Sequence, residues 1–215
     1  MKAFLDEKYM QYSNAGFLKD DPVQVPHLYH KKEDIELAGF ITATLAWGKR
    51  SNIINACHRL FGRMGHAPHE FVTQGSLTDF GALQDFTYRT FNGQDLLYFL
   101  QALQHIYLHK GGLQQVFEDG YKTGGDIKAA LLHFRQVFFS LPGPARTQKH
   151  VANPNKKAAA KRLNMFLRWM VRPAKGQVDF GLWKGIPTAA LCIPLDIHTG
   201  RVARALGLLQ RKQND

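Results

Sequence analysis

Two residues of this sequence, a lysine and an aspartate, lie at the starts of predicted helices, where their charges could serve covalent chemistry. Lys161 opens the segment KRLNMFLRWMVR. The positive end of a helix dipole disfavours the charged form of a lysine there, and Lys156, Lys157 and Arg162 act in the same direction. A free amine is a nucleophile, so this pattern is typical of a lysine that attacks an electrophilic carbon. The alternative is an ordinary, solvent-exposed lysine.

Asp196 opens the segment DIHTGRVARALGL. Aspartate is among the best helix N-caps, which is the structural interpretation of this residue. A carboxylate held by backbone N–H groups stays ionised, so it can also stabilise a developing cation or accept a proton. We expect His198 to be structural or to contact phosphate. We expect no metal site, because the histidines of the chain lack flanking ligands at metal-binding spacing.

The positive charge of the chain is concentrated in one continuous stretch. Residues 127–178 contain no aspartate or glutamate and eleven Lys and Arg residues. Basic and acidic residues balance elsewhere, so this stretch carries the whole formal charge of +11. A localised positive surface attracts polyanions, of which nucleic acid is the commonest. Arg162, Arg168 and Arg172 have no acid nearby in sequence, and they either form a solvated basic face or contact phosphates.

The composition bounds the class of protein. With 45% hydrophobic residues in 215, the chain suits one domain or two small lobes. Two distant cysteines, Cys57 and Cys192, exclude a disulfide scaffold, a four-cysteine zinc site and a four-cysteine iron–sulfur cluster within this chain. The N-terminus lacks the apolar region of a signal peptide, and no apolar run is long enough to span a membrane. We therefore expect a cytoplasmic protein that has no membrane partner.

Helical periodicity dominates the chain and predicts an all-α fold of about eight to ten helices. Glycine or proline follows several of the periodic segments, as is usual where helices end. Residues 87–91 are expected to form a short extended segment, and residues 141–157 a loop. The predicted helices cover residues 34–47, 51–64, 95–109, 113–121, 126–139, 156–171 and 196–208.

The segment IPLDIHTGRVA resembles the signature around the catalytic aspartate of the helix-hairpin-helix (HhH-GPD) superfamily of DNA glycosylases. The helix led by Lys161 resembles the one led by the catalytic lysine of 8-oxoguanine-type members. More narrowly, KRLNMFLRWMVR, DFGLW, IPLDIHTGRVA and YRTF resemble an uncharacterised bacterial family placed in this superfamily, over nearly the whole chain from Phe40 onward. The resemblance implies a single two-lobed HhH-GPD-like domain over residues 1–215. Its hairpin region would lie at about residues 150–172, with DNA in the cleft between the lobes.

The hairpin departs from the superfamily's pattern, which usually reads L-P-G-V-G-x-K. Residues 155–161 read NKKAAAK and contain no glycine. Glycines let the hairpin backbone approach a DNA phosphate closely, so we expect Lys156 and Lys157 to take over this contact. The choice between Lys157 and Lys161 as the nucleophile stays open. The helices that the superfamily has after Leu208 are missing from this sequence, and whether the chain is truncated at its C-terminus stays open.

The function that the resemblance implies is base-excision repair of DNA. The protein would be a glycosylase with abasic-site lyase activity on oxidised, 8-oxoguanine-like purines, acting as a monomer on damaged double-stranded DNA without cofactor or metal. Lys161 and Asp196 would be catalytic. The expected phosphate contacts are Lys156, Lys157, Arg162, Arg168, Arg172 and Arg201. The expected stacking partners of the extruded base are Trp169, Phe180 and Trp183, whereas Trp47 is expected in the core.

Two alternatives remain open from the sequence. The altered hairpin favours a catalytically inactive DNA-binding module that has retained the glycosylase fold. Charge alone also permits an RNA-binding helical protein.

Overall fold

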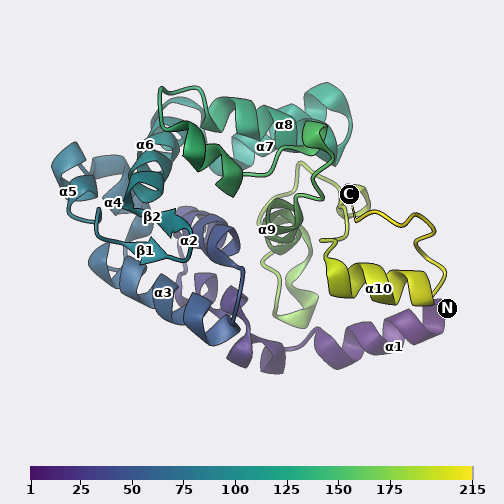
Figure 1. Ribbon diagram of the computed structural model, residues 1–215. Helices are drawn as coiled ribbons and strands as arrows, with labels where there is room; N and C mark the ends of the chain where they lie inside the picture. The colour runs from purple at the N-terminus through teal and green to yellow at the C-terminus, as the bar shows by residue number, and fades with distance from the viewer. Residues whose placement is uncertain (215) are drawn as a thin grey trace.

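The chain folds into a predominantly helical structure, which confirms the all-α prediction (Figure 1). The structure, a computed structural model, describes residues 1–214. Its α-helices are α1 (Lys2–Tyr12), α2 (Lys32–Leu45), α3 (Arg50–Arg63), α4 (Pro68–Gln74), α5 (Leu77–Gly81), α6 (Gly93–His109), α7 (Gly112–Gly124), α8 (Ile127–Phe138), α9 (Lys161–Val171) and α10 (Ile197–Ala205). Short 3-10 helices connect them: η1 (Ala15–Asp20), η2 (Pro22–Gln24), η3 (Pro26–Leu28), η4 (Ala145–His150), η5 (Pro154–Lys156), η6 (Ala174–Gly176) and η7 (Thr188–Ala190).

The strongly periodic segments form helices where the sequence predicts them. Residues 34–47, 51–64, 95–109 and 126–139 correspond to α2, α3, α6 and α8, with ends that differ by at most two residues. Residues 113–121 correspond to α7, which continues further, to Gly124.

Two predicted segments differ from the structure for local reasons. The helix expected over residues 156–171 begins only at Lys161, because Lys157 and Ala160 adopt left-handed backbone conformations with φ of 55° and 47°. An α-helix of L-residues cannot continue through that conformation. The extended segment is one arm of a small antiparallel hairpin, in which β1 (Thr87–Tyr88) pairs with β2 (Phe91–Asn92).

Helix α2 runs through the centre of the hydrophobic core. It is buried continuously from Ile35 to Leu45, as expected of a helix whose sequence is apolar on most sides. The Phe40 ring lies 5.3 to 5.9 Å, centroid to centroid, from four phenylalanines of neighbouring helices. At Gly39 an added Cβ would lie 3.2 Å from Met170 Cε, so the glycine allows α9 to pack closely on α2. The core therefore fixes α9 against α2.

A buried carboxylate holds the loop before α9 in place. Asp95 is fully buried in α6 and accepts a hydrogen bond from Thr147 Oγ1 at 2.8 Å. Its other oxygen lies 2.8 Å from Arg146 Nη1 and 3.1 Å from His150 Nε2. Charge pairing and hydrogen bonds of this kind offset the cost of burying a carboxylate. The residues expected to form a loop, 141–157, are therefore partly helical and anchored through η4.

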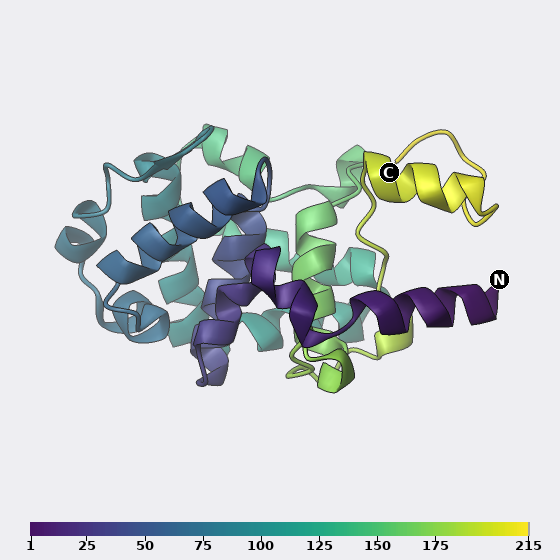
Figure 2. The same cartoon turned by 90° about the horizontal axis from the view of Figure 1, so that it is seen from below.

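The first and last helices lie at the same end of the molecule (Figures 1 and 2). Helix α1 has no buried residue, and Gly200 is the buried residue of α10. Among residues 1–214, no helix combines the length and the apolar character that crossing a bilayer requires.

Candidate active site

An ion pair joins the starts of α9 and α10. Lys161 Nζ lies 2.6 Å from Asp196 Oδ2, although the two residues are 35 positions apart in the chain. Asp196 is the N-cap of α10, and its Oδ1 accepts a hydrogen bond from the backbone N–H of Thr199 at 2.8 Å. The two oxygens of one carboxylate therefore serve different partners: one caps a helix and the other holds a lysine.

The carboxylate of this pair is ionised at neutral pH. Burial opposes ionisation, but the hydrogen bond from Lys161 and the backbone N–H of Thr199 outweigh it and lower the pKa of Asp196 to about 2. About two fifths of the Lys161 side chain and about a third of the Asp196 side chain remain exposed. A reacting group can therefore reach both.

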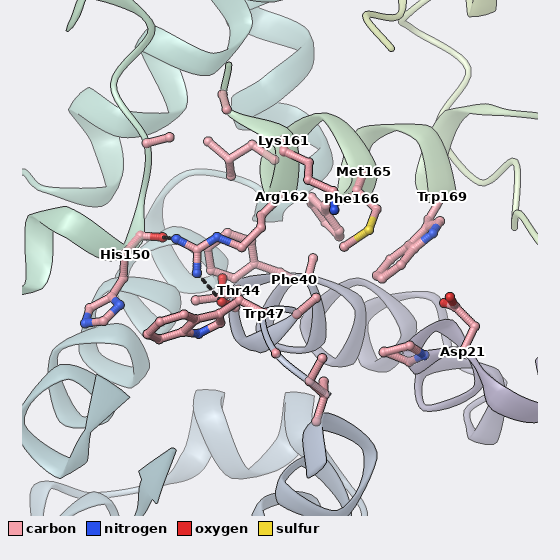
Figure 3. Close-up of a pocket in the computed structure, with 18 of the residues that line it drawn as sticks. Asp21, Phe40, Thr44, Trp47, His150, Lys161, Arg162, Met165, Phe166 and Trp169 are labelled. Atoms are coloured by element: carbon pink, nitrogen blue, oxygen red, sulfur yellow. Dashed lines mark hydrogen bonds between the residues drawn. The ribbon is translucent and has the colours of Figure 1, made fainter. Parts of the chain in front are cut away.

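A cavity of about 530 Å³ lies beside Lys161 (Figure 3). Its walls come from the end of α2, the starts of η2 and α3, the end of η4 and one face of α9. Cavities of this size hold small ligands. The wall combines aromatic with polar side chains, among them Phe40, Trp47, Phe166, Trp169, Asp21, His150, Lys161 and Arg162.

Helix α9 is amphipathic, and it contributes both to the core and to the cavity wall. Leu163, Phe166, Leu167 and Met170 are buried, as their spacing predicts. Because Lys161 and Trp169 both line the cavity, the cavity follows α9 for about two turns.

Arg162 is a structural residue of the cavity wall, and not a free contact for phosphate as the sequence suggested. Its guanidinium group donates hydrogen bonds to the backbone oxygens of Thr44 and His150. These bonds connect α9 with the end of α2 and with η4 (Figure 3). The sequence could not show this, because carbonyl acceptors carry no signature in residue type.

Arg168 and Arg172 are also bound within the protein. Arg168 Nε lies 3.2 Å from Asp179 Oδ1, and Arg172 Nε lies 3.5 Å from Asp179 Oδ2. Asp179 is buried; burial raises its pKa, while the charges of Arg168 and Arg172 act in the opposite direction. The prediction that no acid neutralises these arginines is wrong, because the chain folds back after α9 and places Asp179 against them.

The remaining predicted cations face solvent. Lys156 and Lys157 are exposed at the turn before α9, and Arg201 is exposed on α10. Lys156 and Lys157 precede Lys161 in the chain, and Arg201 follows Asp196.

The predicted stacking residues separate into different environments. Trp169 lines the cavity. Trp183 is fully buried, and its Nε1 donates a hydrogen bond to Glu36 Oε1 at 2.7 Å, so its assignment to a base pocket is wrong. Phe180 stacks on His27 with ring centroids 4.2 Å apart. It is not among the residues that line the cavity. Trp47, expected in the core, is half-buried and forms part of the cavity wall.

Comparison with known proteins places this chain in a family. A family model described as a protein of unknown function (DUF2400) matches residues 21–215. The chain belongs to this family. No curated protein and no solved structure gave a significant match. In this DUF2400 chain the match begins at Asp21, a residue of the cavity wall, and includes both members of the Lys161–Asp196 pair.

Asp21 and His150 are polar residues of the DUF2400 cavity that the sequence analysis missed. Asp21 precedes a proline and has the sequence pattern of a turn, but burial raises its pKa and its side chain lines the cavity. His150 is buried with Nε2 against Asp95, and burial lowers its pKa although the charge of Asp95 opposes this. In sequence these residues are isolated, so no local pattern could have identified them.

Among the described residues, no group of three or more His, Cys, Asp and Glu side chains is arranged to hold a metal ion.

Proposed function

We propose that this protein is a DNA glycosylase with abasic-site lyase activity, built on the two-lobed helix-hairpin-helix glycosylase plan. The observation that carries the proposal is the Lys161–Asp196 pair, 2.6 Å apart, beside a cavity of about 530 Å³. A lysine amine, a fixed carboxylate and a cavity for one base are the three parts that excision through a covalent intermediate requires.

The chemistry follows from the two side chains. The Lys161 ammonium, which lies 2.6 Å from the Asp196 carboxylate, first loses a proton to water. The lone pair of Nζ then forms a bond to C1′ of the sugar, and the bond from C1′ to the base breaks. The base departs with that electron pair and takes up a proton from water. Opening of the sugar ring leaves a Schiff base between C1′ and Nζ.

Asp196 would act chiefly through its charge. Its pKa of about 2 keeps it ionised at neutral pH, so it provides a fixed negative charge next to the sugar. Such a preorganised charge stabilises the positive charge that develops on C1′ as the base departs.

The aromatic wall of the cavity suits a planar ligand. Trp169 and Trp47 line the cavity from α9 and from the end of α2, respectively. Flipped bases are bound between aromatic or apolar side chains, and Trp169 is the predicted stacking residue that has this position.

Exposed cations near the site would hold the sugar-phosphate backbone. Lys156, Lys157 and Arg201 face solvent, and the chain has a net formal charge of +11. We propose damaged double-stranded DNA as the partner, with binding that weakens steeply as salt rises.

The test is borohydride trapping on a duplex that carries one 8-oxoguanine, with abasic and undamaged duplexes beside it. Borohydride reduces the Schiff base and leaves a stable protein–DNA adduct. The adduct should form with the wild-type protein and be absent in Lys161→Gln. Lys157→Gln tests the alternative nucleophile four residues away, at an exposed position outside the cavity lining, and trapping at saturating protein offsets any phosphate contact that this variant loses. Loss of the adduct in Lys157→Gln alone would move the nucleophile to Lys157.

A second candidate is a DNA-binding module without turnover. The tight Lys161–Asp196 contact is also what a purely structural ion pair would show. Binding to duplex DNA with no adduct on either damaged duplex would favour this candidate over the enzyme. Stronger competition by duplex RNA than by duplex DNA would count against both.

A further inference from the structure

A carboxylate lies on the cavity wall formed by η2. Asp21 is the N-cap of η2, and its Oδ1 accepts a hydrogen bond from the backbone N–H of Val23 at 3.1 Å. Figure 3 shows its carboxylate directed toward Trp169 of α9. Asp21 therefore faces the indole that the proposed function assigns to base stacking.

Much of the hydrogen-bonding capacity of this carboxylate is unused. A carboxylate offers about four lone-pair positions, and Val23 occupies one of them. The nearest cation, Arg50 Nη2, lies 3.7 Å from Oδ2, beyond hydrogen-bonding distance. Only 15% of the Asp21 side chain is exposed, whereas 60% of Arg50 is exposed. Burial raises the pKa of Asp21, against the Val23 hydrogen bond and the charges of Arg50, Arg168 and Lys161. Donors from a ligand would offset this loss of hydration.

The position of Asp21 in the cavity wall determines which edge of an extruded base could contact its carboxylate. Lys161 and Trp169 are separated by eight residues of α9, or about 12 Å of helix. A base bound in the cavity with its sugar carbon at Lys161 Nζ would extend along α9 toward Trp169, because both residues line the cavity. Its edge opposite the sugar would then lie toward Asp21, which lines the same cavity and whose carboxylate is directed toward Trp169.

We propose that Asp21 selects guanine-type bases by accepting hydrogen bonds from N1–H and the N2 amino group of the extruded base. This inference rests on the proposed glycosylase function. The two donors lie side by side on the edge of guanine opposite the sugar and match the two oxygens of a carboxylate. An adenine-type base presents a ring-nitrogen acceptor at N1, which a carboxylate repels. Asp21 would therefore distinguish guanine-type from adenine-type bases, and the rest of the cavity would distinguish damaged from normal guanine.

The test compares single-turnover base release from three duplexes that differ in one base: 8-oxoguanine, 8-oxohypoxanthine and 8-oxoadenine. The second base keeps N1–H but lacks the N2 amino group. Asp21→Asn keeps the shape and the helix-capping ability of the side chain but replaces one acceptor with a donor. We expect Asp21→Asn to slow release of 8-oxoguanine by roughly 10- to 100-fold, the effect of losing hydrogen bonds to a charged group. The loss on 8-oxohypoxanthine should be smaller, and the preference for 8-oxoguanine over 8-oxoadenine should fall.

Three controls distinguish an effect of Asp21 on base selection from an effect on folding or on the catalytic step. Asp20→Asn makes the same substitution at the adjacent, exposed carboxylate and should change no rate. Asp21→Ser retains a capping oxygen without the carboxylate, so it repeats the test if the asparagine variant is poorly folded. Trapping on the abasic duplex, which contains no base, should be unchanged in both Asp21 variants.

The possible outcomes are distinguishable. If Asp21→Asn releases 8-oxoguanine at the wild-type rate, or slows all three bases and abasic trapping equally, the inference is wrong while the glycosylase proposal stands. The same holds if the wild-type protein releases 8-oxoadenine faster than 8-oxoguanine. If the wild-type protein releases none of the bases and traps no abasic site, the proposed function fails and the inference fails with it.

Discussion

Arg168 on α9 and Arg172, the C-cap of that helix, converge on a single buried carboxylate, that of Asp179. Asp179 therefore neutralises part of the positive charge that the sequence shows at α9. The positive charge available to a partner therefore differs from the charge that the sequence displays. It lies on exposed cations such as Lys156 and Lys157, before the helix, rather than along its length.

This difference predicts how salt should affect binding to duplex DNA. Lys156→Ala should reduce the slope of log affinity against log salt by about 0.9 for a lost phosphate contact. Arg168→Ala should leave the slope unchanged, because its guanidinium is already paired with Asp179. Fluorescence anisotropy with labelled duplex DNA over a salt series measures both slopes. An equal reduction in the two variants would show that Arg168 leaves Asp179 to bind phosphate.

The Asp179 cluster should also contribute to stability. Asp179→Asn leaves two arginines without their charge partner, and we expect the free energy of unfolding to fall by about 1–3 kcal/mol. The arginine side chains keep about a third of their surface exposed, which limits the cost because water can solvate them. Asp20→Asn, at an exposed position, should change stability by less than about 0.5 kcal/mol. Urea denaturation measures both, and a neutral Asp179→Asn would refute a stabilising role.

The Lys161–Asp196 pair predicts a specific titration. The pKa of Asp196 is lowered to about 2, below the value of about 3.9 for an unperturbed aspartate. Because the folded-state pKa is the lower one, the pair stabilises the fold above about pH 4, and this stabilisation is lost as the pH falls toward 2. Lys161→Gln removes the lysine's hydrogen bond to Asp196 and its positive charge, but it leaves the hydrogen bond from the backbone N–H of Thr199. The pKa of Asp196 should therefore rise toward the ordinary value. Carboxyl carbon-13 NMR follows this titration. An unchanged midpoint in Lys161→Gln would contradict the assignment, and Lys157→Gln should leave the midpoint near 2.

Much of the local structure could be predicted from the sequence. The apolar spacing of Leu163, Phe166, Leu167 and Met170 predicted the buried face of α9, and the structure confirms it. Asp196 was predicted to cap α10, and its Oδ1 does accept the Thr199 N–H. Helix periodicity and capping depend on residues within one or two turns of each other, so the sequence contains the whole of that information.

The site depended on contacts between distant segments. Sequence patterns placed Lys161 and Asp196 in or at the first turn of two predicted helices, but only the packing of α9 and α10 brings their side chains to 2.6 Å. Trp183 was expected in the cavity and is buried in the core, whereas Trp47 was expected in the core and lines the cavity. Burial depends on which segments pack against a side chain, and the sequence alone does not show this. The start of α9 was misplaced because Lys157 and Ala160 adopt left-handed conformations that their residue types do not favour. The sequence by itself thus determined the helices, their caps and the net charge, which arise from short-range interactions. The tertiary structure decided which charges are neutralised and which side chains share the cavity, because these depend on segments far apart in the chain.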